Sequence, residues 1–512
     1  MELSVRNRAY QIVVIIVVFF VSVNAANIYE DLELLGQTLT IVRDSYVDEV
    51  DLEYLINEAI RGMVEYLDEH STYLDTEDVR LFEEEAHGRF GGIGVMVGLR
   101  EGVPTIVAPI ERSPAWSVGL RPGDSILEID GIATLGMSLR SAVARLRGSV
   151  GSTVTITVRR PGISGFTRLE IEREEITIPT VPYYFTVEAD NGEKIGYIRF
   201  SMFIHSSTKA LRTAIDGLVK QDVSGLVIDL RGNPGGLLSE ATAAADLLMP
   251  PGELICYTIG NKGAAFNEYS SAEPPLVKSQ RVVLLVDEGS ASGSEILSGA
   301  LQSSEEGIVV GKRTYGKGTV QEIRYLEDGS AIKITTARWF TPDGVCVDMN
   351  LGTVDSLRFP DAKPMKGIIP NIAVKSAPGD TMILEVTAGL IQQFLDSNAE
   401  KIGSGSTDIS DFSVDTTIVH EFSDWLSLDS ELKESYPDSV RDMIREIAER
   451  KEAVRRYIGT EIVRRKWGDE GVARYDCETD PFVITGIDIA ADAIRFENSL
   501  PLRATKLDSL QG

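Results

Sequence analysis

Cysteine and histidine are scarce in this chain of 512 residues, which has three cysteines and four histidines. They are Cys256, Cys346, Cys477, His70, His87, His205 and His420. The cysteines are odd in number, far apart and include no Cys-x-x-Cys pair, so neither a zinc site nor a disulfide scaffold is predicted. The histidines are also isolated from one another along the chain. We therefore expect no metal site and no other cofactor.

Basic side chains are also in the minority, because 50 Lys and Arg face 78 Asp and Glu, giving a net charge of -28. A chain with this balance repels the phosphate backbone of nucleic acids, so no nucleic-acid partner is expected. Apolar residues make up 43% and charged residues 25%, which is typical of a globular protein. The length is sufficient for two to four domains.

Only one long hydrophobic run occurs, and it lies near the N-terminus. Arg6 and Arg8 precede the apolar run Ile12–Val23, and the sequence Val23-Asn24-Ala25 is suitable for a signal peptidase. The wider stretch 9–26 comes close to the ~20 residues that span a bilayer. We therefore predict that residues 1–26 form a signal peptide or a membrane anchor, with a buried strand as the less favoured alternative. Both main alternatives predict an exported protein, either periplasmic or anchored to the inner membrane and facing the periplasm. Residues 9–26 would touch the membrane only if they stay uncleaved.

The rest of the chain divides into four regions by pattern. Residues 27–87 show apolar residues at helical spacing, and residues 88–161 show short strands separated by glycine turns. Residues 176–380 alternate strands with helices, and residues 381–512 are mainly helical and charge-rich after a Gly-Ser linker at 403–406. The predicted fold class is therefore mixed α/β with several domains.

Compact apolar strands in the third region indicate a largely parallel sheet. They are Ile195–Phe200, Gly225–Leu230 and Val282–Val286, and each precedes a glycine-rich segment and then a helical pattern. This order is typical of βαβ units. Further strands are predicted at Ile332–Phe340 and Gly367–Val374, and a helix from Thr381 to about Leu395.

The first candidate catalytic feature is Gly289–Ile296, which reads Gly-Ser-Ala-Ser-Gly-Ser-Glu-Ile directly after a predicted strand. Small residues at a strand-to-helix turn can expose a hydroxyl beside the free N–H groups of the helix start. Such N–H groups would stabilise a developing oxyanion. The alternative is an ordinary N-cap serine in a loop.

The second feature is a lysine between two glycines, at Gly316-Lys317-Gly318. Close backbone approach at glycine would allow the amine to be buried, which disfavours its charged form and makes it available as a base. A Walker phosphate loop is the rival interpretation. It needs Ser or Thr directly after the lysine and a following helix, whereas Gly318 follows here and no helix is evident.

The third feature is the glycine-rich loop Asp229–Gly236, which reads Asp-Leu-Arg-Gly-Asn-Pro-Gly-Gly after a predicted strand. Its glycines allow backbone N–H groups to approach a substrate closely. Alone it is an ordinary loop at the end of a strand.

Together the three motifs resemble the carboxyl-terminal processing (tail-specific) proteases, over roughly residues 30–375. The resemblance implies a ClpP/crotonase-like α/β peptidase core and a Ser–Lys dyad, with Ser292 as nucleophile and Lys317 as general base. Gln321 would orient the lysine, since Ser303 stands where some members have an acidic residue. The N–H of Gly293 and one N–H from Gly235 or Gly236 would form the oxyanion hole. Many members have Ala where this chain has Gly293.

The segment 88–161 resembles a PDZ domain. Its carboxylate-binding loop would be Phe90, Gly91, Gly92, Ile93, Gly94 and Val95. The N–H groups of such a loop can hold the terminal carboxylate of a peptide that adds as a strand to the sheet edge. The alternative is a β domain with glycine-rich hairpins and no such role.

These features predict a serine endopeptidase that recognises C-terminal tails of exported proteins and cleaves them by a Ser–Lys dyad. Two non-enzymatic alternatives remain: a catalytically silent PDZ scaffold that binds C-terminal peptides, and a retinoid-binding-like module on the same fold. The residues Ser292, Lys317 and Gln321 argue against both. Expected partners are protein or peptide C-termini, with a possible adaptor or self-association through the C-terminal region.

Overall fold

The structure is a computed structural model that describes residues 31–100, 102–110, 112–121, 123–160, 165–260, 266–348, 363–374, 390–395, 397–398, 409, 412–428, 447 and 450–500. The predicted signal or anchor at 1–26 and the linker at 403–406 lie outside these residues, as does most of the helix predicted from Thr381. The chain divides into two compact units, Met1–Arg80 with Gln321–Thr335, and Leu81–Val320 with Thr336–Gly512.

The smaller unit is mainly helical, as its sequence pattern predicts. Residues 31–45 are helical, and α2 (Leu52–Glu65) begins at Asp51, whose side chain accepts the N–H of Tyr54. The prediction missed β1 (Thr72–Leu74), which pairs antiparallel with the start of β18 (Ala331–Phe340). A three-residue strand is too short to show alternation, so its sequence gave no signal.

In the larger unit, the predicted PDZ segment 88–161 forms a small β domain together with a strand that lies beyond its predicted end, Thr167–Glu172, because this strand pairs with Thr153–Arg159. Its elements are β3 (Val95–Arg100), β4 (Val103–Pro109), α4 (Pro114–Ser117), β5 (Ser125–Ile129), β6 (Ile132–Ala133), α5 (Leu139–Leu146), β7 (Thr153–Arg159) and β8 (Thr167–Glu172). The strands form one sheet in the order β3-β4-β5-β7-β8, with β6 paired to β5. Ile126, Ile156 and Leu146 are buried in its core.

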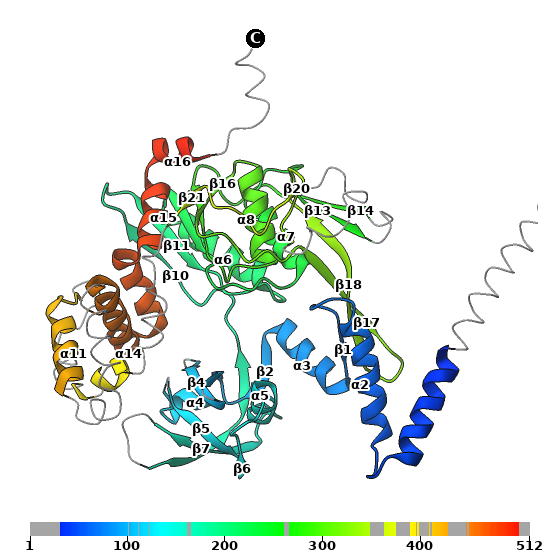
Figure 1. Ribbon diagram of the computed structural model, residues 1–512. Coiled ribbons are helices and arrows are strands. Elements are labelled where there is room, and N and C mark those ends of the chain that lie inside the picture. The colour runs from blue at the N-terminus through cyan, green and yellow to red at the C-terminus, as the bar shows by residue number, and fades with distance from the viewer. Residues whose placement is uncertain are drawn as a thin grey trace, which may run out of the picture. The chain divides into compact units, whose positions relative to one another are not determined.

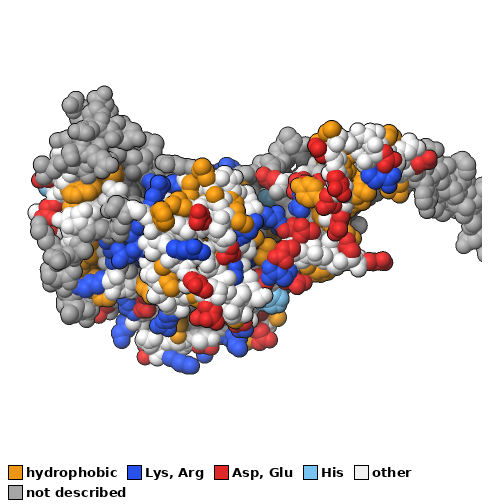
Figure 2. Space-filling view, turned by 90° about the horizontal axis from the view of Figure 1, so that it is seen from below, with side chains coloured by type: hydrophobic (Ala, Val, Ile, Leu, Met, Phe, Trp, Pro, Cys, Tyr) orange, Lys and Arg blue, Asp and Glu red, His pale blue; other side chains and the backbone are white. Residues whose placement is uncertain are grey.

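On the face shown in Figure 2, basic side chains are scattered among acidic and hydrophobic ones over the described residues.

The peptidase-like region is built on a six-stranded sheet in the order β10-β11-β12-β15-β16-β21. The strands are β10 (Tyr184–Glu188), β11 (Lys194–Arg199), β12 (Gly225–Asp229), β15 (Arg281–Val286), β16 (Gly307–Gly311) and β21 (Ile372–Ala373). All neighbours are parallel except β10 and β11, so the prediction of a largely parallel sheet is confirmed. The strand predicted at Gly367–Val374 is limited to β21, because Gly367 has a φ of 66° and Ile368 bonds to Thr314 instead.

Helices cover both faces of this sheet (Figure 1). On one face, α6 (Ser207–Val219), α7 (Leu238–Asp246) and α8 (Gly293–Ser303) pack in one core with Ile228 and Leu284. On the other face, α15 (Pro481–Ala491) packs against the neighbouring residues Val227 and Leu285. Successive strand residues point to opposite faces, so both faces are apolar and buried. The C-terminal region thus supplies part of this core, which its sequence did not predict.

A second, antiparallel sheet was not predicted. In the larger unit, β13 (Leu254–Gly260) pairs with β14 (Phe266–Ser270) and with the Ala337–Phe340 end of β18. The strands β19 (Val345–Cys346) and β20 (Lys363–Pro364) form a short parallel pair. These additions leave the fold class mixed α/β, as predicted.

The C-terminal region is mainly helical in its described part, as predicted. Its helices are α11 (Thr417–Leu428), α14 (Lys451–Thr479), α15 and α16 (Ala493–Ser499). Phe422, Val454 and Ile458 are buried in a separate cluster of this region. Among the helices that the structure describes, none combines the length and the apolar character that crossing a membrane requires.

Candidate active site

Ser292 occupies a sharp turn between β15 and α8. Its backbone has a φ of 51° and a ψ of -107°, a conformation that non-glycine residues rarely adopt. Such strain is characteristic of functional sites. The neighbouring serines are fully buried, and their hydroxyls donate to backbone carbonyls: Ser290 to Leu230, and Ser294 to Asn233. Ser292 is partly exposed, so it is the serine of this motif best placed to meet a substrate.

The carboxylate of Glu295 joins the serine turn to the lysine loop. One oxygen, Oε2, accepts the N–H of Ser292 at 2.8 Å and the N–H of Lys317 at 2.9 Å. The other, Oε1, accepts the N–H of Gly316 at 2.7 Å and the hydroxyl of Thr314. Glu295 is fully buried, and this burial raises the pKa of its carboxyl despite the hydrogen bonds, which lower it. The two predicted reacting residues are thus held at one buried oxygen.

Lys317 is partly buried in a loop that approaches its surroundings closely. Its carbonyl accepts the indole N–H of Trp339 at 3.0 Å. A Cβ on Gly318 would lie 2.7 Å from the backbone N of Asp348, so only glycine fits there without movement. The loop continues into strand β17 (Thr319–Tyr325) rather than a helix, so it lacks the helix of a Walker phosphate loop.

Asn233 fixes the glycine loop against the serine turn. Its amide is fully buried, donates to the carbonyl of Phe200, and accepts the N–H of Gly235 at 2.9 Å. Its backbone carbonyl accepts the N–H of Ala291 at 3.0 Å. A Cβ on Gly235 would lie 2.5 Å from the backbone N of Gly293, which shows how closely the two loops approach.

Some backbone N–H groups where the glycine loop meets the serine turn already donate a hydrogen bond, and others do not. The N–H of Gly235 is occupied by Asn233, whereas those of Gly236 and Gly293 have no hydrogen-bond partner among the described residues. Of the two alternatives for the second oxyanion donor, the geometry therefore favours Gly236. A Cβ on Gly293 would lie 3.0 Å from the ring of Phe203, which is a tight contact. Alanine at this position therefore needs only a small shift of the neighbouring side chain.

Asp229 begins the glycine loop and is surrounded by positive charge. Its side chain is 1% exposed, and both of its oxygens bond to the guanidinium of Arg231, with the shortest distance at 2.6 Å. Arg199 and the hydroxyl of Tyr197 also donate to it. Although burial acts in the opposite direction, these arginines hold the pKa of Asp229 well below its usual range.

Gln321 belongs to the smaller unit, where it lies on β17. Its side-chain amide donates to the hydroxyl of Thr335 at 3.1 Å. Its predicted role beside Lys317 therefore stays a prediction.

The predicted carboxylate loop is divided between a strand and a turn. Phe90, Gly91 and Gly92 lie on β2 (Arg89–Gly92), which pairs antiparallel with β9 (Glu174–Thr177). Ile93 and Gly94 form the turn to Val95, the first residue of β3, and Gly94 has a φ of 74°. The side chain of Ile93 is buried in the core of the β domain. Only Ile93 and Gly94 of the predicted loop therefore lie outside a strand.

Sequence reasoning missed three polar residues that hold the site: Asn233, Asp287 and Glu295. Asp287 accepts the N–H groups of Gly232 and Gly289, at 2.8 and 2.9 Å, and so also ties the two loops together. For Glu295 a signal was present, because Ser292 and Glu295 have the Ser-x-x-Glu spacing of a capping box. No local pattern distinguished the other two from ordinary loop residues.

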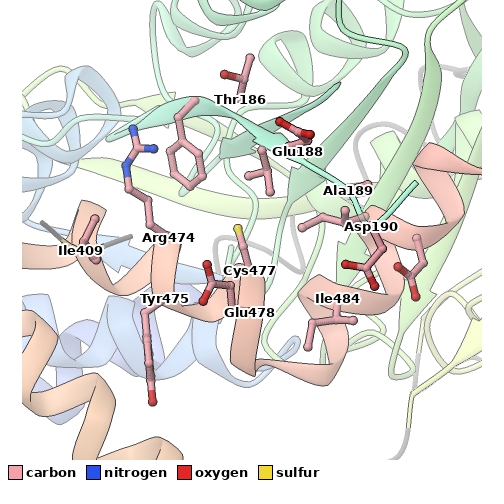
Figure 3. A pocket seen from close by; sticks show the side chains of 14 residues that line it. Thr186, Glu188, Ala189, Asp190, Ile409, Arg474, Tyr475, Cys477, Glu478 and Ile484 are labelled. Carbon is pink, nitrogen blue, oxygen red and sulfur yellow. The ribbon is translucent and has the colours of Figure 1, made fainter. Parts of the chain in front are cut away.

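A pocket of about 660 Å³ lies apart from these residues, between β10 and helices α14 and α15 (Figure 3). Glu188, Asp190 and Arg474 are among its lining residues. None of the predicted site residues lines it, so it contributes nothing to the assignment.

Comparison with known proteins gives the class of the chain. The family model described as "Peptidase family S41" matches residues 194–355, and "PDZ domain" matches residues 105–160. A third, "Activating protease CtpB N-terminal domain", matches residues 21–78. The class that the fold and the site define is therefore a serine-type peptidase with a PDZ domain.

Individual relatives identify the family to which the chain belongs within this class of peptidases. The chain is 37% identical over 304 residues to the carboxy-terminal processing protease CtpA of Bacillus subtilis, covering 59% of this chain and 64% of that protein. It is 35% identical over 328 residues to the carboxy-terminal-processing protease of Bartonella bacilliformis, covering 63% of this chain and 74% of that protein. Among solved structures, the photosystem II D1 C-terminal processing protease matches with 28% identity and a TM-score of 0.43, covering 67% of this chain and 92% of that one. The chain belongs to the carboxy-terminal processing proteases of family S41.

Proposed function

We propose that this protein is a serine endopeptidase that binds C-terminal tails of exported proteins through its PDZ domain and cleaves by a Ser292–Lys317 dyad. The observation that carries the proposal is the hydrogen bonding of both backbone N–H groups, from Ser292 and Lys317, to Oε2 of Glu295. Two loops that are 25 residues apart in sequence are thereby fixed to one buried atom. A PDZ scaffold without catalytic activity has no need of this arrangement.

In the proposed mechanism, the neutral amine of Lys317 takes the proton of the Ser292 hydroxyl as the oxygen attacks the scissile carbonyl. The free N–H groups of Gly236 and Gly293 stabilise the oxyanion that forms. The lysine then protonates the leaving amine, and water hydrolyses the acyl-enzyme. Gln321 is the residue that the family resemblance assigns to orienting the lysine.

The proposed location follows from residues 1–26. Two basic residues and an apolar run would direct the chain out of the cytoplasm, as a cleaved signal peptide or as an anchor. The peptidase would then meet exported proteins in the periplasm. Mass spectrometry of the mature N-terminus distinguishes a cleaved from an uncleaved segment.

The mechanism is tested by replacing Lys317 with Arg and with Ala. Arginine keeps the positive charge but cannot lose its proton, so both variants are expected to lose nearly all cleavage of an unfolded substrate with an apolar C-terminus. Lys312→Arg is the matched control, because Lys312 lies in the same loop and pairs with Glu288 at the surface, at 3.0 Å. An active Lys317→Arg enzyme would show that this residue supplies only charge.

The proposed recognition of chain ends is tested with one substrate in three forms. The first ends in apolar residues with a free carboxylate, the second carries a C-terminal amide, and the third ends in Asp-Asp. The first should be cleaved fastest, because a free carboxylate can accept several backbone N–H bonds and an apolar end can fill a PDZ pocket. Equal rates for the acid and the amide would mean that the PDZ domain does not recognise chain ends.

A further inference from the structure

The C-terminal helical region reaches the glycine loop of the candidate active site at Arg231, which bonds to Asp480 and lies over the ring of Phe482 at 5.8 Å. Oδ1 of Asp480 accepts the N–H of Phe482 at 2.8 Å and so caps the start of α15. Its Oδ2 accepts Nη1 of Arg231 at 2.9 Å. The carboxylate and the guanidinium are largely buried, at 13% and 18% exposure. A single carboxylate therefore joins a helix start to the loop Asp229–Gly236.

Arg231 is held from two sides. Nε and Nη2 bond to Asp229 at the end of β12, while Nη1 bonds to Asp480. Its planar fork can satisfy both carboxylates at once, which a lysine could not do. Gly235 and Gly236 follow four and five residues later, so the position of Arg231 constrains the loop that carries a predicted oxyanion donor.

The helix that carries Asp480 is itself fixed to the sheet. Val483 and Ile487 of α15 are buried in one cluster with Val227 of β12 and Leu285 of β15. Asp480 thus stands on a rigid element that packs beneath the catalytic strands. A charged partner on such an element restrains the loop more than one on a flexible chain would.

We propose that Asp480 is a positioning residue for the loop Asp229–Gly236, acting through Arg231, and that the C-terminal helical region thereby contributes to turnover at Ser292. The inference rests on the function proposed above. Asp480 lies well beyond residue 355, where the match to the peptidase family ends. The C-terminal helical region would thus contribute to catalysis, although its sequence indicated no catalytic role.

The substitution Asp480→Asn separates the two roles of this side chain. Asparagine caps a helix as well as aspartate, so α15 should keep its start. One of the two negative charges that Arg231 faces is lost, and the loop is less firmly placed. Because oxyanion donors act mainly in the transition state, kcat should fall about tenfold while KM stays unchanged.

Asp492→Asn is the matched control. Asp492 caps the next helix, α16, by accepting the N–H groups of Ile494 and Arg495. The change is the same substitution at the same kind of cap in the same region. Its contacts in the described part of the chain do not include the glycine loop, so its kcat should equal that of the unmodified enzyme.

A double-variant cycle checks that the effect passes through Arg231. Arg231→Lys removes the fork and should also lower kcat. If Asp480 acts only through this guanidinium, adding Asp480→Asn to Arg231→Lys should lower kcat less than twofold further. Additive losses would overturn the proposed route.

The full-length enzyme is assayed with the apolar-tailed substrate, and thermal unfolding and tail-peptide binding are measured for each variant. A tenfold lower kcat for Asp480→Asn, measured at a temperature where the variant stays folded and with KM and peptide affinity unchanged, supports the inference. A kcat per folded molecule equal to that of the unmodified enzyme overturns it. Failure of the proposed function appears separately, as an inactive unmodified enzyme or an active Ser292→Ala variant.

Discussion

Asp229 and Glu295 are both buried carboxylates in the motifs that form the candidate site, yet their surroundings shift their pKa values in opposite directions. Asp229 faces two guanidinium groups, from Arg199 and Arg231, and its pKa is lowered. Glu295 faces neutral N–H and O–H donors, and its pKa is raised by burial. The same chemical group is thus stabilised by charge in one place and by backbone dipoles in the other.

This difference indicates what each carboxylate does. The ion pairs of Asp229 neutralise charge within one loop and link that loop to other elements, which is a structural task. The donors of Glu295 come from the turn with the predicted nucleophile and the loop with the predicted base, so its bonds set their relative positions. We expect substitution of Asp229 to cause the larger loss of stability, and substitution of Glu295 the larger loss of catalysis.

The largest effect is expected for Asp229→Asn. Removing one partner of a buried ion pair leaves uncompensated charge, which costs about 3–5 kcal/mol in the free energy of unfolding. Because the pKa of Asp229 is lowered in the folded state, its contribution is present above the unfolded value of ~3.9 and is lost as the pH falls below it. Urea unfolding at pH 7 and at pH 3 should show a large difference from the unmodified protein that shrinks at pH 3. An equal difference at both pH values contradicts the assignment.

Glu295→Gln is the sharper test of the comparison. The neutral amide directs an N–H₂ group at backbone donors, so kcat/KM should fall about 100-fold, equivalent to about 2.7 kcal/mol. The free energy of unfolding should change less than in Asp229→Asn, because no cation loses its partner. Peptidase kinetics and urea unfolding of the two variants, measured together, check this reversal. A variant with normal kinetics but greatly reduced stability would give Glu295 a structural task only.

A smaller, pH-dependent effect is expected at Asp476, on α14. Burial and the nearby charge of Asp480 raise its pKa to about 7. A raised pKa stabilises the protein at low pH, and this contribution is lost as the pH rises through the folded value. Asp476→Asn should therefore be more stable than the unmodified protein above pH 7, and equally stable near pH 4. Thermal unfolding from pH 4 to pH 8 measures this, and a parallel pH profile for both proteins would contradict it.

Much of the fold could be predicted from local patterns. The strands β11, β12 and β15 lie within one residue of their predicted bounds at each end. Compact apolar runs between glycines gave clear signals there. The serine and lysine loops were found because small residues cluster at the ends of such strands.

The remainder depended on contacts between distant parts of the chain. The sequences of β13 and β14 show no distinct periodicity of apolar residues, and these strands are defined by their pairing. Asn233 resembles any loop asparagine until its amide is seen bonded to Phe200 and Gly235. The packing of α15 on the sheet joins residues more than 190 positions apart, such as Leu285 and Val483, which no local pattern can indicate.

We propose that Ser292 is the nucleophile of a tail-directed peptidase. The most direct measurement is the cleavage rate of an unfolded substrate with an apolar C-terminus by the unmodified protein and by Ser292→Ala, with circular dichroism as a check of folding. We expect cleavage by the unmodified protein and none by the folded Ser292→Ala variant. Substantial turnover by that folded variant would contradict this proposal.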